Sequence, residues 1–213
     1  MDLIIEKIKK HAKEIFSNSR GSHDWEHTLR VYELSLHIGK KENADLPILK
    51  ISALLHDIGR ENQDKSNGKI CHAEKGAELA RDLLSTFEID KEKIDKIVHC
   101  IKTHRFRGNN IPNSKEAKIL FDADKLDAIG AVGIGRAFLF SGEIGARLHN
   151  PDVDIGKTEQ YTKEDTAYRE FLVNLKKIKD RMLTNEGKKI AEKRHDFMIK
   201  FFDRLNKEVK GDL

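Results

Sequence analysis

The residues of this chain best suited to chemistry are a histidine and an aspartate, His56 and Asp57, side by side at the end of an apolar helical run. Another histidine, His27, precedes them in a second stretch with helical spacing, and an acidic segment at 121–127 follows much later. Imidazole and carboxylate groups together suit a divalent metal such as Mn, Fe, Zn or Mg. One His-Asp pair means little, but a histidine, a His-Asp pair and an aspartate on separate helices indicate a metal site.

The acidic segment contains several aspartates, which the geometry of a helix separates. Leu120, Asp124 and Asp127 follow one another at spacings of 4 and 3 and share a face, whereas Asp122 lies roughly 200° around the helix from Asp124. An intact helix therefore cannot bring both Asp122 and Asp124 to one metal. Asp124 is the better ligand, and Asp127, one turn on, is expected to orient a ligand histidine. The alternative role for Asp122 is an acid near the start of the helix.

Each candidate also has a purely structural interpretation. His27 and His104 lie on apolar stripes, where a single histidine is more often a hydrogen-bonded core residue than a ligand. Asp57 at the C-terminal end of a helix opposes the helix dipole. A bound cation would explain that placement, and so would an ion pair with Arg60 or Lys65.

A second His-Asp pair, His23 and Asp24, lies shortly before His27. We interpret this segment as the entry to a helix, with Ser22 or Asp24 as its N-terminal cap. His23 is then expected at the mouth of the pocket rather than among the metal ligands.

The two cysteines, Cys71 and Cys100, form no Cys-x-x-Cys pattern and no disulfide framework, which is typical of an intracellular protein. Each adjoins a histidine (His72 and His99), so a Cys2His2 zinc site is a competing hypothesis, although the spacing is not that of a zinc finger. The N-terminal segment lacks the apolar core of a signal peptide. No run approaches the roughly 18 apolar residues of a membrane span, and we predict a cytoplasmic protein.

The composition indicates a packed, helix-rich chain, because 38% of the 213 residues are hydrophobic and only 3 are proline. This length suits one domain. The 40 basic and 36 acidic residues nearly cancel. A net charge of +4, evenly spread, argues against a nucleic-acid groove but is compatible with an anionic small molecule.

Apolar spacing along almost the whole chain predicts an all-α fold. The helices are expected around residues 4–15, 27–38, 48–58, 73–86, 91–104, 117–140, 163–183 and 188–207. Pro47 suits the first turn of the third helix and Gly59 its C-terminal cap. Residues 61–70 and 141–162 are expected to be loops, and the second has room for a short hairpin. A capping box is predicted at Thr162.

Three segments carry a resemblance to a known family: Ser22-His-Asp-Trp-Glu-His-Thr-Leu-Arg-Val31, Leu54-Leu-His-Asp-Ile-Gly59 and Asp122-Ala-Asp-Lys-Leu-Asp-Ala128. They resemble the hallmark segments of the HD-domain phosphohydrolases, a superfamily of all-helical metal enzymes. Residues 129–138 are similar to the YpgQ/YedJ-like branch of uncharacterised hydrolases. The resemblance implies a single HD-type helical bundle over residues 1–213, with a core at about 20–140 and a C-terminal helical annex at about 160–210.

The resemblance also implies the site. Carried over by position, the metal ligands are His27, His56, Asp57 and Asp124. The family's fourth ligand is the aspartate of an Ala-Asp-x-Leu segment, which selects Asp124 and agrees with the helical-face argument. His72 and His104 match positions where some members hold a second metal or the phosphate, and we expect one metal with both histidines near the phosphate.

Such a metal would lower the pKa of a water and polarise a phosphoryl oxygen, so that the water attacks phosphorus. Asp57 is expected to position that water or accept its proton. The residues expected to neutralise the phosphate are His72, His104, Arg60 and Lys125. Lys125 points about 100° away from Asp124 on a helix, and surface ion pairing is the alternative for Arg60 and Lys125.

The resemblance implies a small-molecule phosphate ester as substrate, most simply a nucleotide, and the branch includes nucleoside-triphosphate pyrophosphohydrolases. The Gly-Tyr-Pro extension of cyclic-di-GMP phosphodiesterases is absent, because Gly59 is followed by Arg60. Two alternatives remain: a non-catalytic nucleotide sensor, and an HD-type di-iron oxygenase with His72 and His104 as iron ligands. No nucleic-acid or membrane partner is expected, and a homodimer is allowed.

Overall fold

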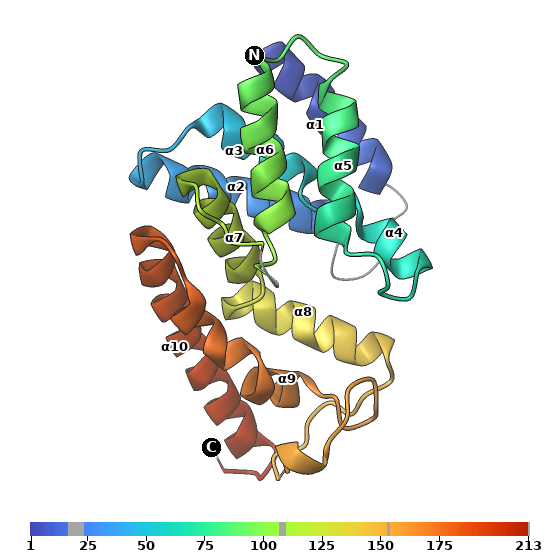
Figure 1. The fold of residues 1–213 in the computed structure, drawn as a ribbon. Helices are drawn as coiled ribbons and strands as arrows, with labels where there is room; N and C mark the ends of the chain where they lie inside the picture. The colour runs from blue at the N-terminus through green and yellow to red at the C-terminus, as the bar shows by residue number, and fades with distance from the viewer. Residues whose placement is uncertain (17–23, 107–109, 153, 213) are drawn as a thin grey trace. The chain divides into compact units, whose positions relative to one another are not determined.

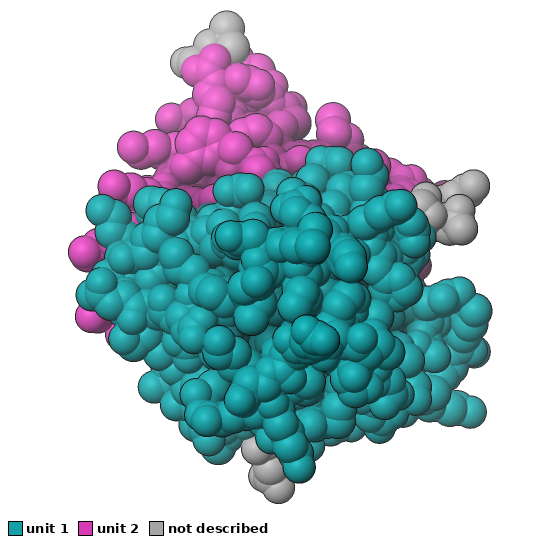
Figure 2. Space-filling view, turned by 90° about the horizontal axis from the view of Figure 1, so that it is seen from above, with its two compact units in different colours: residues 1–124 teal, residues 125–213 magenta. Residues whose placement is uncertain are grey.

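The computed structural model describes residues 1–16, 24–106, 110–152 and 154–212. Within these ranges the chain forms helices and no strand (Figure 1), which confirms the predicted all-α class. The chain divides into two compact units, residues 1–124 and 125–213 (Figure 2), which we describe separately. The single HD-type domain expected over the whole chain stays a prediction. None of the described helices is long and apolar enough to cross a membrane.

The first unit is built around one apolar helix. Its helices are α1 (Asp2–Phe16), α2 (Trp25–Lys41), α3 (Leu46–Leu55), α4 (Arg60–Lys65), α5 (His72–Leu84), α6 (Lys91–Thr103) and the greater part of α7 (Lys115–Asp127). The helix α3 packs against α1, α2 and α6. Most of its residues are buried, as expected for a helix that is apolar all round.

Aspartates cap several of these helices and so satisfy backbone N–H groups at their N-termini. Asp24 accepts a hydrogen bond from the His27 backbone N–H at 2.8 Å, which confirms Asp24 as the cap of α2. Asp45 accepts one from Ile48 at the start of α3, at 3.2 Å. Ser22 and His23 lie outside the described residues.

The end of α3 differs from the prediction, which placed it at Ile58 with Gly59 as its cap. The helix ends at Leu55 with His56 as its C-cap. Gly59 has a φ of −86° and precedes α4, so the loop predicted at 61–70 is wrong in its first half. The sequence conceals α4 because this helix is short and has no buried residue.

Gly59 is instead required by a close approach of two backbones. A Cβ at this position would lie 2.3 Å from the His72 carbonyl oxygen and 2.6 Å from the Gly76 nitrogen. Only a glycine allows α5 to come this near. The turn that carries Asp57 therefore lies directly against the start of α5.

The long helix predicted over 117–140 is two helices, α7 and α8 (Gly130–Glu143). Gly130 has a φ of +78°, a left-handed conformation that glycine adopts readily. The Arg194 Nη1 donates to the Leu126 carbonyl at 2.5 Å, which satisfies one of the free carbonyls at the end of α7.

The second unit contains α8, α9 (Ala167–Val173), α10 (Asn185–Glu208) and the 3-10 helices η2 (Ile155–Lys157) and η3 (Leu175–Arg181). The helix predicted over 163–183 is wrong as one piece, because it is divided between α9 and η3. Stacked rings of Phe171 and Phe202, with centroids 4.6 Å apart, join α9 to α10.

The segment 141–162 is largely irregular, as predicted, although α8 extends to Glu143. Its described residues include η2 and no strand, so they form no hairpin. The buried Arg169 holds this segment, since it donates to Asp165 Oδ1 at 2.8 Å and to Thr158 Oγ1 at 2.7 Å. The N-cap of α9 is Thr166 rather than the predicted Thr162.

Candidate metal centre

Six histidine and aspartate side chains converge in the first unit, from the ends of three helices and the interiors of two. The six are His27, His56, Asp57, His72, His104 and Asp124. His56 and His104 are the C-caps of α3 and α6, and His72 is the first residue of α5. Five of the side chains are buried, whereas that of Asp124 is 14% exposed.

One group of donors consists of His27, His56 and Asp124, whose ligand atoms all lie within 4.8 Å of one another. The Nε2 atoms of His27 and His56 are 3.3 Å apart. The Asp124 Oδ1 lies 3.5 Å from the His27 Nε2. Three of the four predicted metal ligands are thus together.

A second group consists of Asp57, His72 and His104, again with ligand atoms within 4.8 Å of one another. The Asp57 Oδ1 lies 3.1 Å from the His72 Nε2 and 3.6 Å from the His104 Nε2. The other Asp57 oxygen, Oδ2, is 3.9 Å from the Nε2 atoms of both His27 and His56. Asp57 therefore faces each group with a different oxygen and joins the two.

Hydrogen bonds made by the Nδ1 atoms, which face away from the site, determine which ring nitrogen of each histidine carries the proton. The His56 Nδ1 lies 2.8 Å from the Ala53 carbonyl, and the His104 Nδ1 lies 2.7 Å from the Ile101 carbonyl. A carbonyl only accepts, so each Nδ1 carries a proton, and in a neutral ring the Nε2 then presents a lone pair to the site. These carbonyls are available because both histidines end a helix.

Burial keeps two of the rings neutral. It lowers the pKa of His56 to about 4, although the Asp57 carboxylate acts in the opposite direction. Burial likewise lowers the pKa of His72 to about 4, although the nearby Asp57 carboxylate acts in the opposite direction. Neutral imidazole is the form that binds metal.

These residues fit a divalent metal. Imidazole nitrogens and a carboxylate oxygen converge within 4.8 Å of one another in each group, so a cation placed among them would be held by several donors. The same mixture of nitrogen and oxygen donors suits Zn, Mn or Fe.

The ion pair considered for Asp57 exists with Arg60, whose Nη2 lies 3.3 Å from the Asp57 Oδ2. The other candidate, Lys65, pairs instead with Glu61 at 2.5 Å. Arg60 approaches the Oδ2 of Asp57, whereas the Oδ1 faces His72 and His104. The ion pair is therefore compatible with a metal role for this carboxylate.

The remaining acids of α7 have other surroundings. Asp122 is fully buried in the middle of the helix, so its interpretation as an acid near the helix start is wrong. Asp127 receives a hydrogen bond from Arg136 Nη1 at 2.7 Å. Asp127 was expected to orient a ligand histidine, but backbone carbonyls rather than Asp127 accept the Nδ1 hydrogen bonds of His56 and His104. Lys125 is half-buried and belongs to the second unit.

The cysteines of the competing zinc site have other surroundings. Cys100 is buried, and burial raises the pKa of its thiol to about 12. Cys71 is half-buried, and His72 already faces Asp57. Among the described residues, the groups that could hold a metal contain no cysteine.

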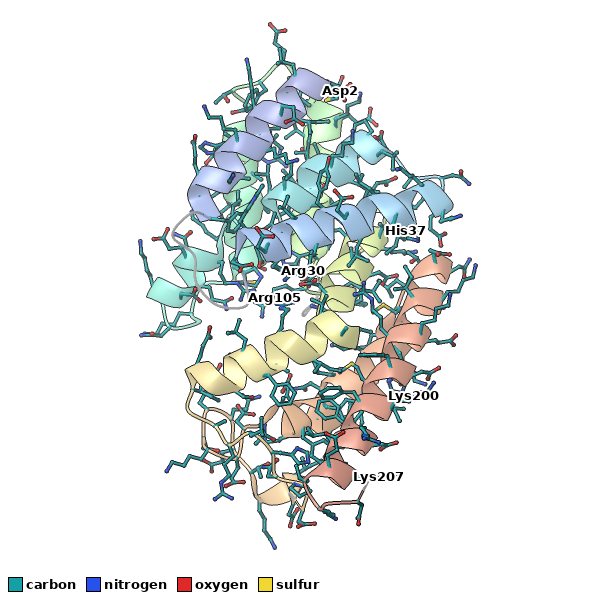
Figure 3. All side chains as sticks on the ribbon, turned by 180° about the vertical axis from the view of Figure 1, so that it is seen from behind. Asp2, Arg30, His37, Arg105, Lys200 and Lys207 are labelled. Atoms are coloured by element: carbon teal, nitrogen blue, oxygen red, sulfur yellow. The ribbon has the colours of Figure 1, made fainter. Side chains whose placement is uncertain are left out.

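Two residues of the site escaped the sequence analysis. Gln63 on α4 has its Oε1 2.9 Å from the His72 Nδ1. Arg105, labelled in Figure 3, follows His104, and its Nη1 lies 3.0 Å from the same oxygen of Gln63. No signal in the sequence identified Gln63, because its segment has the composition of a loop.

Comparisons with known proteins agree with this geometry. The profile of the HD domain matches residues 24–129. The uncharacterized protein YpgQ of Bacillus subtilis is 36% identical over 211 residues, which cover 97% of this chain and 94% of YpgQ. The crystal structure of YpgQ in complex with ADP superposes with a TM-score of 0.75 at 35% identity, covering 98% of this chain and 100% of that one. An HD-superfamily hydrolase from Bacillus thuringiensis gives a TM-score of 0.78 at 29% identity, covering 98% of each chain.

Proposed function

This chain belongs to the HD-domain family, and we propose on that premise that it is a metal-dependent phosphohydrolase that acts on nucleotides. The observation that carries the proposal is the Asp57 carboxylate, buried between two groups of metal-binding side chains. The ADP complex of its relative YpgQ supports a nucleotide as the substrate.

The proposed metal ligands are His27, His56, Asp57 and Asp124. When bound, a divalent metal would supply an activated water and polarise the phosphoryl group. Asp57 is suited to orient that water or to accept its proton, because its two oxygens face both groups of donors. Burial of the surrounding histidines excludes bulk water and strengthens these interactions.

His72 and His104 are proposed to act on the phosphate, as expected from the sequence, a role that requires a proton on the Nε2 of each ring. The structure adds a specific reason to weigh a second metal, since both Nε2 atoms lie within 3.6 Å of the Asp57 Oδ1. A metal count separates these roles: one ion per chain assigns the histidines to the phosphate, and two ions assign them to metal binding.

Arg60 and Lys125 are proposed to neutralise charge on the phosphate. The Arg60 side chain is 21% exposed and so reaches from Asp57 toward solvent. A guanidinium in this position can bind Asp57 and a phosphate oxygen through different nitrogens. For Lys125 the support is its place next to Asp124 in the sequence.

The test is hydrolysis across a panel of nucleoside mono-, di- and triphosphates with Mn²⁺, with metal-stripped protein as the control. The released product is identified as phosphate or pyrophosphate. Pyrophosphate from triphosphates would support a nucleoside-triphosphate pyrophosphohydrolase. No turnover by protein with bound metal would reject the hydrolase and leave the nucleotide sensor and the di-iron oxygenase.

The di-iron oxygenase is a second candidate, and the joined donor groups are the observation that favours it. Its requirement for His72 and His104 as ligands is compatible with their position beside Asp57. Two tightly bound irons and an activity that is lost without oxygen would support it.

A cytoplasmic location is proposed from the free cysteines.

A further inference from the structure

The two histidines of the second donor group differ in the group that accepts a hydrogen bond from their Nδ1, the ring nitrogen that faces away from the site. His104 ends α6 and hydrogen-bonds a carbonyl of its own helix, as His56 does at the end of α3. His72 begins α5, and the carbonyls of a helix N-terminus are already engaged in the first turn. Its Nδ1 therefore needs an acceptor from another part of the chain, and the Gln63 Oε1 of α4 lies 2.9 Å away.

Arg105 fixes which atom of the Gln63 amide faces His72. The Arg105 Nη1 lies 3.0 Å from this atom, and a guanidinium only donates hydrogen bonds. The atom is therefore the amide oxygen, which only accepts. An oxygen that accepts from Arg105 requires the proton of His72 to be on Nδ1 for the second hydrogen bond to form.

Two neighbours of His72 favour a proton on Nε2 instead of Nδ1. The Arg105 Nη1 itself lies 3.5 Å from the His72 Nδ1 and could donate to it. The Asp57 Oδ1, 3.1 Å from the His72 Nε2, could accept a proton there. Gln63 is closer to the ring than either neighbour, and a cation that binds Asp57 removes this carboxylate from the competition. Removing the Gln63 oxygen would leave a donor as the nearest group to Nδ1.

We propose that Gln63, held by Arg105, is a positioning residue that keeps the His72 proton on Nδ1. The Nε2 lone pair then faces the Asp57 Oδ1 and the His104 Nε2, where it can bind a cation rather than donate to a phosphate. Any effect of Gln63 on turnover rests on the proposed function, whereas the position of the His72 proton does not. Outer hydrogen bonds of this kind orient metal-binding histidines generally.

The variants Gln63→Met and Gln63→Glu separate this role from a structural one. Methionine keeps the length of the side chain without an acceptor, while glutamate keeps the acceptor. The Gln63 backbone carbonyl accepts from Gly68 at 2.9 Å, a contact that both variants retain. Asp64→Met, at an exposed position of the same helix, is the matched control.

The measurement is the protonation of each imidazole nitrogen by ¹H–¹⁵N NMR, in protein labelled at histidine and loaded with one equivalent of diamagnetic Zn²⁺ per chain, which is not enough to fill both donor groups. His72→Gln assigns the signals of His72. We expect a proton on Nδ1 in the wild type, Gln63→Glu and Asp64→Met, and on Nε2 in Gln63→Met. Arg105→Met should give a mixture of both forms, because the amide can then turn around, and Arg105→Lys should resemble the wild type.

Zinc affinity, from competition with a coloured chelator, is a second readout. Gln63→Met should bind a second equivalent of Zn²⁺, the one held by His72, about 10- to 100-fold more weakly, with Gln63→Glu restoring the affinity. A wild-type His72 protonated on Nε2, or a Gln63→Met variant with an unchanged ring, would overturn the inference. If no nucleotide is hydrolysed while the expected NMR pattern holds, the proposed function fails and the inference stands.

Discussion

Replacing Gly59 by alanine tests whether the approach of α5 to the Asp57 turn builds the site. The φ of Gly59, −86°, is one that alanine adopts without strain, so the effect of the change is purely steric. The new Cβ would lie 2.3 Å from the His72 carbonyl oxygen, and real Cβ contacts are not shorter than 3.0 Å. The difference, 3.0 minus 2.3, requires the two backbones to separate by about 0.7 Å.

This separation has a cost in stability because both obstructing atoms belong to the backbone and cannot rotate away. Overpacking of this kind costs about 3 kcal/mol at the upper end of its usual range. For a chain of this length that corresponds to a Tm lower by roughly 6–12 °C. The same movement shifts His72 relative to Asp57, and a misplacement near 1 Å can lower turnover by about 100-fold.

Thermal unfolding followed by circular dichroism measures the change, with two glycine variants as controls. Gly76→Ala meets its nearest neighbour, the Gly59 nitrogen, at 3.3 Å and should stay within about 1 kcal/mol of the wild type. Gly135→Ala has no neighbour within 4 Å and should gain about 1 kcal/mol from helix propensity. A Gly59→Ala protein as stable as the wild type would refute the steric argument.

Three further variants or treatments have definite expected outcomes. Asp57→Asn should lose bound metal, seen by elemental analysis, while its circular dichroism stays that of a folded protein; full metal content would contradict the site. Iodoacetamide should modify Cys71 in native protein and Cys100 only after unfolding, because burial raises the Cys100 pKa to about 12. Since that thiol ionises more easily in the unfolded chain, stability should fall as pH rises from about 9 toward 12, which pH-dependent melting measures. Gly130→Ala should destabilise by about 1–3 kcal/mol, because φ is +78° and a Cβ would lie 2.9 Å from the Arg194 Cγ; an unchanged Tm would argue against this strain.

Much of the first donor group was predictable because its residues lie at helical spacings. The period of an α-helix separates Asp124 from Asp122, and the structure brings only Asp124 of the two into the described donor groups. The apolar stripe of α2 likewise places His27 on a buried face. These predictions need only local geometry, which a sequence contains.

Other features depend on contacts that no local pattern encodes. Gln63 reaches His72 from a helix too short and too polar to have a periodic signal. The break between α7 and α8 was missed because glycines in an apolar stretch allow close helix packing as well as a left-handed turn. Gly130 adopts the turn, and Arg194, far along the chain, completes the end of α7.

The position of Asp57 between two donor groups has a consequence for charge balance. Histidines bind metal in their neutral form, so the donors carry only the two negative charges of Asp57 and Asp124. One divalent ion cancels these charges, and a second would leave an excess of two positive charges. A nucleotide phosphate would offset that excess. Occupancy by a second cation and binding of an anionic nucleotide should therefore be thermodynamically linked, each raising the affinity for the other by the same factor.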